Sequence, residues 1–415
     1  MNRLLLFTAG LMALAPLACK AQKSQYLYKG NAPEGNTSAR PEGRPALVVK
    51  TGAEQFEAYL PLLKGKRVAV LVNQTSAVGA ELLPDALLRQ GVKVVTIFSP
   101  EHGFRGNADA GAHVKSGIDT RTGLPVISLY GDNKKPKPEQ LKDIDVVLYD
   151  LQDVGVRFYT YISSLEYLLE ACGEQQKEVV VLDRPNPLGN IVDGPVLQPK
   201  YRSFVGMQPI PIIYGMTPGE YAKMLVGEGW IKARNVKLTV VPCANYTHKT
   251  LYRLPVAPSP NLKNMAAIYL YPSLCLFEGT VVSVGRGTDA PFQQYGHPAL
   301  KNYTYSFVPK SVEGATNPPL KGQTCYGELL ASDANTAYRM TESGFQLKWL
   351  LKAYQNYPDK ATFFNSNNFF RTLAGTDQLQ EQIKKGLSEE EIRKSWKADL
   401  EKFRAIRDNY LLYEE

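Results

Sequence analysis

Short apolar runs recur along the first 250 residues of the chain, and segments of helical character separate most of them. The apolar runs cover residues 67–73, 92–98, 125–130, 145–150 and 178–183. The helical segments cover about 80–90, 136–142 and 158–174. Strands buried on both faces give near-continuous apolar runs, and their alternation with helices is typical of a parallel sheet. The pattern predicts an α/β fold with a Rossmann-like, mostly parallel sheet and helices on both faces.

A capping box at Thr217 marks the start of a further helix. Pro218 stands at the first helical position and Glu220 lies three residues after Thr217, which is the arrangement that satisfies the free N–H groups of a helix start. We expect this helix to cover 218–227 and one more strand to cover 236–241.

Beyond about residue 250 the predicted elements become shorter, and aromatic and turn residues become frequent. We therefore predict a Rossmann-like catalytic domain at 46–250 and a smaller, mixed α+β domain at 251–415 that closes a cleft over it. The last helix should begin at Ser388, because apolar side chains follow it at helical spacing and form a stripe that we interpret as core packing. The stripe consists of Ile392, Trp396, Leu400, Phe403, Ile406 and Tyr410.

The first 21 residues have the features of a signal peptide. Arg3 precedes an apolar run at 4–17, and small residues surround a cut before Gln22. A cut before Cys19, followed by lipid anchoring through that residue, is the alternative. We expect an exported protein, periplasmic or extracellular, with a flexible leader at 22–45. No later apolar run reaches the roughly 18 residues of a transmembrane helix, so we expect no stable membrane span.

Composition narrows the class of protein. The 415 residues are enough for two domains, and 44% hydrophobic with 21% charged residues is usual for a folded enzyme. The formal charge of +8 comes without a Lys/Arg run, which argues against a nucleic-acid partner. No Gly-x-Gly-x-x-Gly follows the first strand, so we expect no nicotinamide and no other cofactor. The widely spaced cysteines of the mature chain are expected to be core thiols, with a disulfide as the alternative. They are Cys172, Cys243, Cys275 and Cys325.

Polar residues follow each predicted strand of the first domain. The carboxyl ends of parallel strands meet at one edge of a sheet, so these residues are expected to surround one small ligand. The groups are Asn73, Glu101-His102, Tyr130-Gly131-Asp132, Asp150 to Asp153, and Asp183 to Pro187.

The loop at 99–106 is the leading active-site candidate. It places Glu101 and His102 between Pro100 and Gly103, directly after a buried strand. Glu101 is suited to act as a general acid if Phe98 and Phe104 raise its pKa by desolvation. His102 is expected to orient Glu101 or to bind a substrate hydroxyl, and a structural histidine is the alternative.

Two further strand ends carry charged groups. Asp150 and Asp153 are candidates for a second acid/base or for binding sugar hydroxyls, and Asp153 alternatively caps the following helix. Arg157 follows one helical turn later. In the run Asp183-Arg184-Pro185-Asn186-Pro187, Arg184 is a candidate clamp for a substrate carboxylate, while an ion pair with Asp183 is the competing interpretation.

The second domain contributes a polar, glycine-punctuated stretch. Glu278 lies in 277–280, and Arg286 and Asp289 lie in 284–292, where Gly285 and Gly287 allow tight turns. We expect this stretch to close the cleft. A metal site drawn from the histidines and aspartates remains an alternative, although none shows the local spacing usual for zinc. Its candidate ligands are His102, Asp109, His113, Asp150 and His297.

In several long segments the chain resembles the bacterial family of exo-acting β-N-acetylmuramidases, formerly a family of unknown function. The similar segments are 98–106, 145–161, 182–187, 256–262 and 276–291. The resemblance implies a Rossmann-like domain packed on a smaller one, with the site between them. It also implies removal of terminal N-acetylmuramic acid from the non-reducing end of peptidoglycan fragments, either disaccharides or muropeptides. The family's proposed catalytic glutamate corresponds to Glu101.

Glycoside hydrolysis normally needs two carboxyl groups, about 5–5.5 Å apart for retention and about 6.5–9.5 Å apart for inversion. The candidates to partner Glu101 are Asp150, Asp153 and Glu278. The lactyl carboxylate of the substrate requires a cation, for which Arg157, Arg184 and Arg286 are the candidates, and we expect Arg105, Asp183, Asn186 and Asp289 to assist binding. The alternatives are a metal-dependent hydrolase using His102, His113 and Asp150, and a non-catalytic protein that binds cell-wall amino sugars.

Overall fold

The computed structural model describes residues 47–104, 116–233 and 235–415. The expectations for the signal peptide, the leader, Cys19, Arg105, Asp109 and His113 therefore lie outside the described residues. No helix within the described ranges is long and apolar enough to cross a membrane.

Seven strands of the described chain form one sheet in the order β5-β6-β4-β1-β7-β8-β9. Neighbouring strands run parallel, except that β5 is antiparallel to β6. The predicted parallel sheet is confirmed, and the two-residue strand β5 is an addition that the apolar pattern did not indicate. The strands are β1 (Val68–Val72), β4 (Val94–Ser99), β5 (Gly117–Ile118), β6 (Pro125–Ser128), β7 (Val146–Asp150), β8 (Glu178–Leu182) and β9 (Lys237–Val241).

Helices cover both faces of this sheet, as predicted. Along β1, Val68, Val70 and Val72 pack with residues of α1 and α2, whereas Ala69 and Leu71 pack with residues of α4 and α5. Successive side chains of a strand point to opposite faces, so each face needs its own apolar cover. The helices are α1 (Phe56–Leu63), α2 (Leu83–Arg89), α3 (Pro138–Leu141), α4 (Tyr161–Glu174) and α5 (Pro218–Gly227).

The capping box at the start of α5 is present as predicted. The backbone N–H of Glu220 donates to the Thr217 hydroxyl at 3.3 Å, and the Thr217 N–H donates to the Glu220 carboxylate at 2.9 Å. These two bonds satisfy N–H groups that a buried helix start would otherwise leave unpaired.

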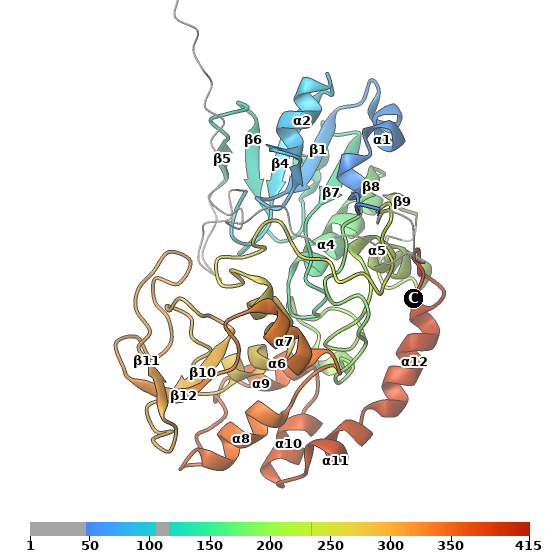
Figure 1. Cartoon of the computed structure of the whole chain (residues 1–415). Helices are drawn as coiled ribbons and strands as arrows, with labels where there is room; N and C mark the ends of the chain where they lie inside the picture. The colour runs from blue at the N-terminus through green and yellow to red at the C-terminus, as the bar shows by residue number, and fades with distance from the viewer. Residues whose placement is uncertain (1–46, 105–115, 234) are drawn as a thin grey trace, which may run out of the picture.

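The C-terminal part, yellow to red in Figure 1, combines a small antiparallel sheet in the order β10-β12-β11 with several short helices. It lies below the large sheet in that view, on the side of the polar strand ends. Its elements are α6 (Met265–Leu274), β10 (Gln294–His297), β11 (Tyr305–Phe307), β12 (Cys325–Leu329), α7 (Ala334–Thr341), α8 (Lys348–Asn356), α9 (Phe369–Ala374), α10 (Gln378–Lys384), α11 (Glu389–Lys394) and α12 (Lys397–Arg407). The remaining short elements are η1 (Gly52–Glu54), the hairpin β2 (Ala77–Val78) and β3 (Glu81–Leu82), η2 (Pro199–Tyr201) and η3 (Cys275–Gly279).

The prediction of one long final helix from Ser388 is wrong. The chain breaks at Ser395 and Trp396 into α11 and α12. The Ser395 hydroxyl donates to the Ile392 carbonyl at 2.6 Å, and the buried Trp396 ring packs edge-on against Phe345. Burying the indole therefore outweighs helical continuity. The apolar stripe is core packing as expected, since its members are buried or pack against the core.

All four cysteines of the described chain are buried free thiols, which confirms their interpretation as core residues. Burial raises the pKa of the Cys172 thiol to about 12, so this thiol stays protonated and unreactive at neutral pH.

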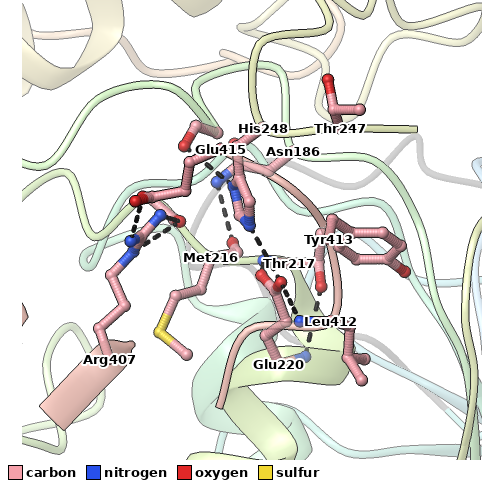
Figure 2. Close-up of polar contacts among 12 residues, drawn as sticks. Asn186, Met216, Thr217, Glu220, Thr247, His248, Arg407, Leu412, Tyr413 and Glu415 are labelled. Carbon is pink, nitrogen blue, oxygen red and sulfur yellow. Dashed lines mark hydrogen bonds and ion pairs between the residues drawn. The ribbon is translucent and has the colours of Figure 1, made fainter. Parts of the chain in front are cut away.

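The C-terminal tail returns to the large sheet after α12 and docks beside α5 (Figures 1 and 2). The Tyr413 hydroxyl donates to the Asp183 carboxylate at 2.5 Å and accepts the Cys243 N–H at 2.8 Å. The Leu412 N–H donates to Glu220 at 2.8 Å, and Glu220 also contacts His248 at 3.0 Å. The last residues of the chain thus complete the hydrogen bonds of buried groups that follow β8 and begin α5.

The Tyr413→Phe variant tests this docking. It removes a buried hydroxyl and leaves the Cys243 N–H without its acceptor, so the free energy of unfolding should fall by about 1–3 kcal/mol. Denaturant unfolding followed by circular dichroism measures this change. The control is Tyr410→Phe, because the Tyr410 hydroxyl donates to Glu228 at 2.7 Å in an exposed position. Equal stability of the two variants would contradict a special role for the Tyr413 hydroxyl.

Candidate functional site

A cavity of about 940 Å³ lies between the carboxyl edge of the large sheet and the C-terminal part. The first part contributes Glu101 and His102 after β4, Tyr130 after β6, and the stretch 158–161 that leads into α4. The C-terminal part contributes Glu278 from η3 and Arg286 from the loop before β10. Chain segments far apart in sequence therefore place two carboxyl groups in one cavity.

The Glu101 loop is a tight turn directly after β4. The Gly103 N–H donates to the Pro100 carbonyl at 3.0 Å, and both His102 (φ 70°) and Gly103 (φ 77°) adopt left-handed backbone conformations. Glycine accepts this conformation readily, but histidine does so at a cost, and such strain is concentrated at functional sites. The turn brings Glu101 and the largely buried His102 into the cavity wall.

Two hydroxyl groups contact the Glu101 carboxyl. The Tyr130 hydroxyl donates to Oε1 at 2.8 Å, and the Thr160 hydroxyl donates to Oε2 at 2.9 Å. Phe98 and Phe104, which were expected as apolar neighbours of this group, are both buried in the hydrophobic core, and neither lines the cavity. The carboxyl is thus oriented by one side chain that follows β6 and one that follows β7, on either side of β4 and β1 in the sheet.

The second carboxyl, Glu278, forms an ion pair with Arg286. The Arg286 Nε donates to Glu278 Oε1 at 2.6 Å, and the guanidinium lies 4.9 Å from the centre of the Phe292 ring. Burial lowers the pKa of Arg286, but the Glu278 carboxylate raises it more, so the pKa is raised overall and the cation is permanent. Asp289, from the same stretch, is exposed and does not line the cavity.

Asp150 and Arg184 pair with each other away from the cavity. Arg184 donates from Nε to Asp150 Oδ1 at 2.5 Å and from Nη2 to Oδ2 at 2.9 Å. The Asp150 side chain is fully buried and the Arg184 side chain is 3% exposed. Such a bidentate pair occupies both groups. The partner of the Arg184 guanidinium is thus Asp150 rather than Asp183. Neither Asp150 nor Arg184 lines the cavity.

Asp153 is a buried carboxyl behind the cavity wall. The Tyr214 hydroxyl donates to its Oδ2 at 2.5 Å and the Gly155 N–H does so at 2.6 Å. Its Oδ1 has no hydrogen-bond partner among the described residues. Burial raises the pKa of Asp153 to about 7, and the hydrogen bonds from Tyr214 and Gly155 offset only part of this loss of solvation.

Arg157 joins the two parts of the chain. Its buried guanidinium donates to the carbonyls of Pro195 and Ile210 from the first part, and to those of Leu373 and Ala374 at the end of α9, each at 2.8 Å. Burial lowers the pKa of Arg157 to about 9, which still leaves it charged at neutral pH. Its contacts are structural, and the cavity wall begins at the next residue.

The remaining predicted binding residues also have structural partners. Asp183 accepts from Thr217 at 2.7 Å and from Tyr413, and Asn186 donates to the Met216 carbonyl at 2.9 Å (Figure 2). Neither lines the cavity. Thr160 and Phe204 do line it, but sequence reasoning missed both. Thr160 lies within the segment 145–161 that carries the family resemblance but had no chemical signal of its own, and Phe204 had no signal at all.

The metal alternative gains no support from the geometry. The described part of the chain contains no group of three His, Cys, Asp or Glu side chains that could hold an ion. Asp150 is held by Arg184, and His113 lies outside the described residues. His297 lines the cavity, where burial lowers its pKa and its Nδ1 accepts the Ala299 N–H at 3.0 Å.

Comparisons with known proteins agree along almost the whole described chain. The sequence models described as exo-β-N-acetylmuramidase NamZ, N-terminal and C-terminal, match residues 68–266 and 269–413. Peptidoglycan β-N-acetylmuramidase NamZ of Bacillus subtilis (strain 168) is 38% identical over 384 residues, which is 88% of this chain and 91% of that protein.

Two crystal structures of DUF1343 family proteins from Bacteroides fragilis have the same fold. One is 48% identical with a TM-score of 0.82, and the other is 31% identical with a TM-score of 0.75. Each comparison covers 89% of this chain and 100% of the solved chain. The α/β architecture with a smaller C-terminal part is therefore shared.

The raised pKa of Asp153 predicts a pH-dependent stability. The folded protein keeps a proton on Asp153 up to about pH 7, whereas the unfolded chain loses it near pH 4. Stability should therefore fall as the pH rises from 4 to 7, by up to about 1.4 kcal/mol per pH unit for this one group. Urea unfolding of the wild type and Asp153→Asn at several pH values measures the slope.

The variant should show the shallower slope over this range. Asp183, whose pKa burial raises to about 6, is present in both proteins, so its contribution cancels in the comparison. Parallel curves for the two proteins would contradict a proton held on Asp153.

Proposed function

Because the chain belongs to the exo-β-N-acetylmuramidase NamZ family, a family of glycosidases, we propose that it releases terminal β-linked N-acetylmuramic acid from the non-reducing end of peptidoglycan fragments. The observation that carries this proposal is the presence of two carboxyl groups, Glu101 and Glu278, in the wall of one cavity. Paired carboxyl groups are what glycoside hydrolysis requires.

Glu101 is the general acid in this proposal. It donates its proton to the glycosidic oxygen as the bond to the anomeric carbon breaks and positive charge develops on the sugar ring, and water supplies the oxygen that the anomeric carbon gains in the products. The hydroxyls of Tyr130 and Thr160 hold one carboxyl oxygen each. They keep the group in the geometry that proton transfer needs.

Glu278 is the second carboxyl group. The permanent cation of Arg286 lies against it at 2.6 Å, which suits a group that acts as a carboxylate while Glu101 acts as an acid. Asp150 and Asp153 are less suited to this role, because both are buried and neither lines the cavity.

Arg286 also binds the lactyl carboxylate of the substrate. Of the three arginines considered for this role, it alone lines the cavity, while Arg157 and Arg184 are engaged elsewhere. Its bond to Glu278 uses Nε, and its two terminal nitrogens have no hydrogen bond to the described residues. A guanidinium edge of this kind suits bidentate recognition of a carboxylate.

The protein acts outside the cytoplasmic membrane in this proposal. The support comes from the signal-like residues 1–21 and from the location of peptidoglycan. The choice between a free and a lipid-anchored form depends on whether cleavage precedes Gln22 or Cys19.

The Glu101→Gln variant tests the activity and the role of the acid together. Purified residues 22–415 should hydrolyse 4-nitrophenyl β-N-acetylmuraminide and the disaccharide MurNAc–GlcNAc, but not the matching N-acetylglucosaminide. The variant should lose about 10²-fold or more on the disaccharide and less on the nitrophenyl glycoside, whose leaving group needs little protonation. The release of nitrophenol and of free sugar measures both rates.

The control is Glu401→Gln, an exposed position on α12. An absence of turnover with either muraminide would contradict the glycosidase and favour a protein that only binds amino sugars. Undiminished activity of Glu101→Gln would show that another group is the general acid.

Replacement of Glu278 by alanine tests the second carboxyl group. Activity should fall by about 10²-fold or more on both muraminides, because this role does not depend on the leaving group. Added formate or azide should restore part of the turnover of Glu278→Ala by occupying the space of the lost carboxylate. Kinetics with and without the anion measure the rescue, and full activity without any anion would exclude Glu278.

A further inference from the structure

Three aromatic side chains form a cluster at the cavity wall, which we call the aromatic rim. It consists of Tyr130, Phe204 and Tyr167. The Phe204 ring centre lies 6.0 Å from that of Tyr167 in a stacked arrangement and 6.2 Å from that of Tyr130 in a tilted one. Tyr130 and Phe204 line the cavity, and all three residues are partly exposed. The catalytic roles above use only the hydroxyl of Tyr130.

Two side chains of α4 hold Phe204 in place. Ser203 and Gly206 pair through both backbone hydrogen bonds, at 2.9 and 3.1 Å, and so fix the turn that carries the ring. The Ser163 hydroxyl donates to the Phe204 carbonyl at 2.7 Å. Ser163 and Tyr167 are four residues apart on α4 and therefore lie on the same face of the helix. Ser163 holds the backbone of Phe204, and Tyr167 supports its ring.

Lys134 lies over the Phe204 ring, with its ammonium 5.0 Å from the ring centre. It forms no ion pair with another described residue. Its flexible four-carbon stem lets it give way to a larger group, while the ammonium stays close enough to donate a hydrogen bond. The exposed surface of Phe204 is thus covered by a displaceable cation rather than by packed core.

The aromatic residues that line the cavity differ in burial. Phe158, Tyr159 and Tyr271 line the cavity and are 3%, 7% and 7% exposed, whereas Tyr130 and Phe204 are partly exposed. An enzyme that acts on a chain end needs an enclosed space for the terminal sugar and an open side for the rest of the chain. The partly exposed aromatic surface of the rim suits the second of these needs.

From this arrangement we infer that the aromatic rim is the subsite for the leaving group, and that it binds the N-acetylhexosamine ring which follows the terminal sugar. The inference rests on the proposed function. Tyr130 connects the rim to the reaction, since its hydroxyl donates to Glu101 Oε1 and the acid must reach the oxygen between the two sugars. Partly exposed aromatic rings offer the C–H face of a pyranose an apolar surface, and Lys134 offers its hydroxyls a donor.

The Phe204→Ala variant tests the inference with two substrates that share the terminal sugar. MurNAc–GlcNAc carries a ring in the leaving group, whereas β-muraminyl fluoride does not. We expect kcat/KM for the disaccharide to fall about tenfold, the upper end of what an aromatic contact contributes, and kcat/KM for the fluoride to stay within about twofold. Phe204→Tyr should retain most of the disaccharide activity.

The matched control is Phe307→Ala, a partly exposed aromatic residue of β11 outside the cavity, which should change neither rate. Thermal unfolding confirms that each variant is folded. Equal losses of Phe204→Ala on both substrates would assign the ring to the fold or to the terminal sugar and overturn the inference. Unchanged rates on both would overturn it as well.

Direct binding separates this inference from the proposed function. Calorimetric titration with free N-acetylglucosamine should give an affinity for the wild type that falls several-fold in Phe204→Ala. If the wild type hydrolysed neither substrate, the proposed function would fail, while this titration would still decide whether the rim binds an aminosugar ring. Equal affinity of the two proteins would reject the rim.

Discussion

The buried guanidinium of Arg157 is the interaction on which the shape of the cavity depends. Four carbonyls, two from each part of the chain, surround it at 2.8 Å. A charge removed from water needs hydrogen bonds, and both terminal nitrogens of Arg157 make them, although its Nε has no partner among the described residues. The end of α9 therefore cannot move away without leaving buried carbonyls unpaired. The position also suits the negative end of that helix. Gly375 is required here, because a Cβ at this position would lie 2.8 Å from Arg157 Nη2.

This anchoring explains how two carboxyl groups from different parts of the chain come to share one wall. Glu101 is oriented by the sheet edge through Tyr130 and Thr160, and Glu278 is oriented by its own loop through Arg286. Neither set of contacts crosses the cavity. Their relative position is therefore set by the contacts of Arg157, which join the two parts of the chain. Arg157 lies immediately before the stretch that carries Thr160. The C-terminal tail adds a second joint, at Asp183 and Glu220.

Much of the fold could be predicted, because its causes are local. Apolar runs marked the central strands, and the capping box at Thr217 marked α5. The break at Trp396 could not be predicted, since it depends on the distant Phe345 that the indole packs against. The same limit applies to the site. The position of Glu101 followed from a strand end, whereas the pairing of Asp150 with Arg184 depends on three-dimensional proximity. The position of Phe204 could not be predicted either, because it depends on contacts with Ser163 and Tyr167 of α4.

The strand ends also show why one edge of a sheet does not act as a single site. After β7 and β8, the charged groups Asp150, Asp153 and Asp183 are buried by the segments that follow, and each accepts a hydrogen bond from an arginine, a tyrosine or a backbone N–H. After β4 and β6, Glu101 and Tyr130 remain on the cavity wall. The buried groups after β7 and β8 stabilise the fold, whereas Glu101 and Tyr130 remain accessible to a substrate. Topology therefore brings the groups to one edge, and the packing of the segments that follow each strand decides which of them remain on the cavity wall.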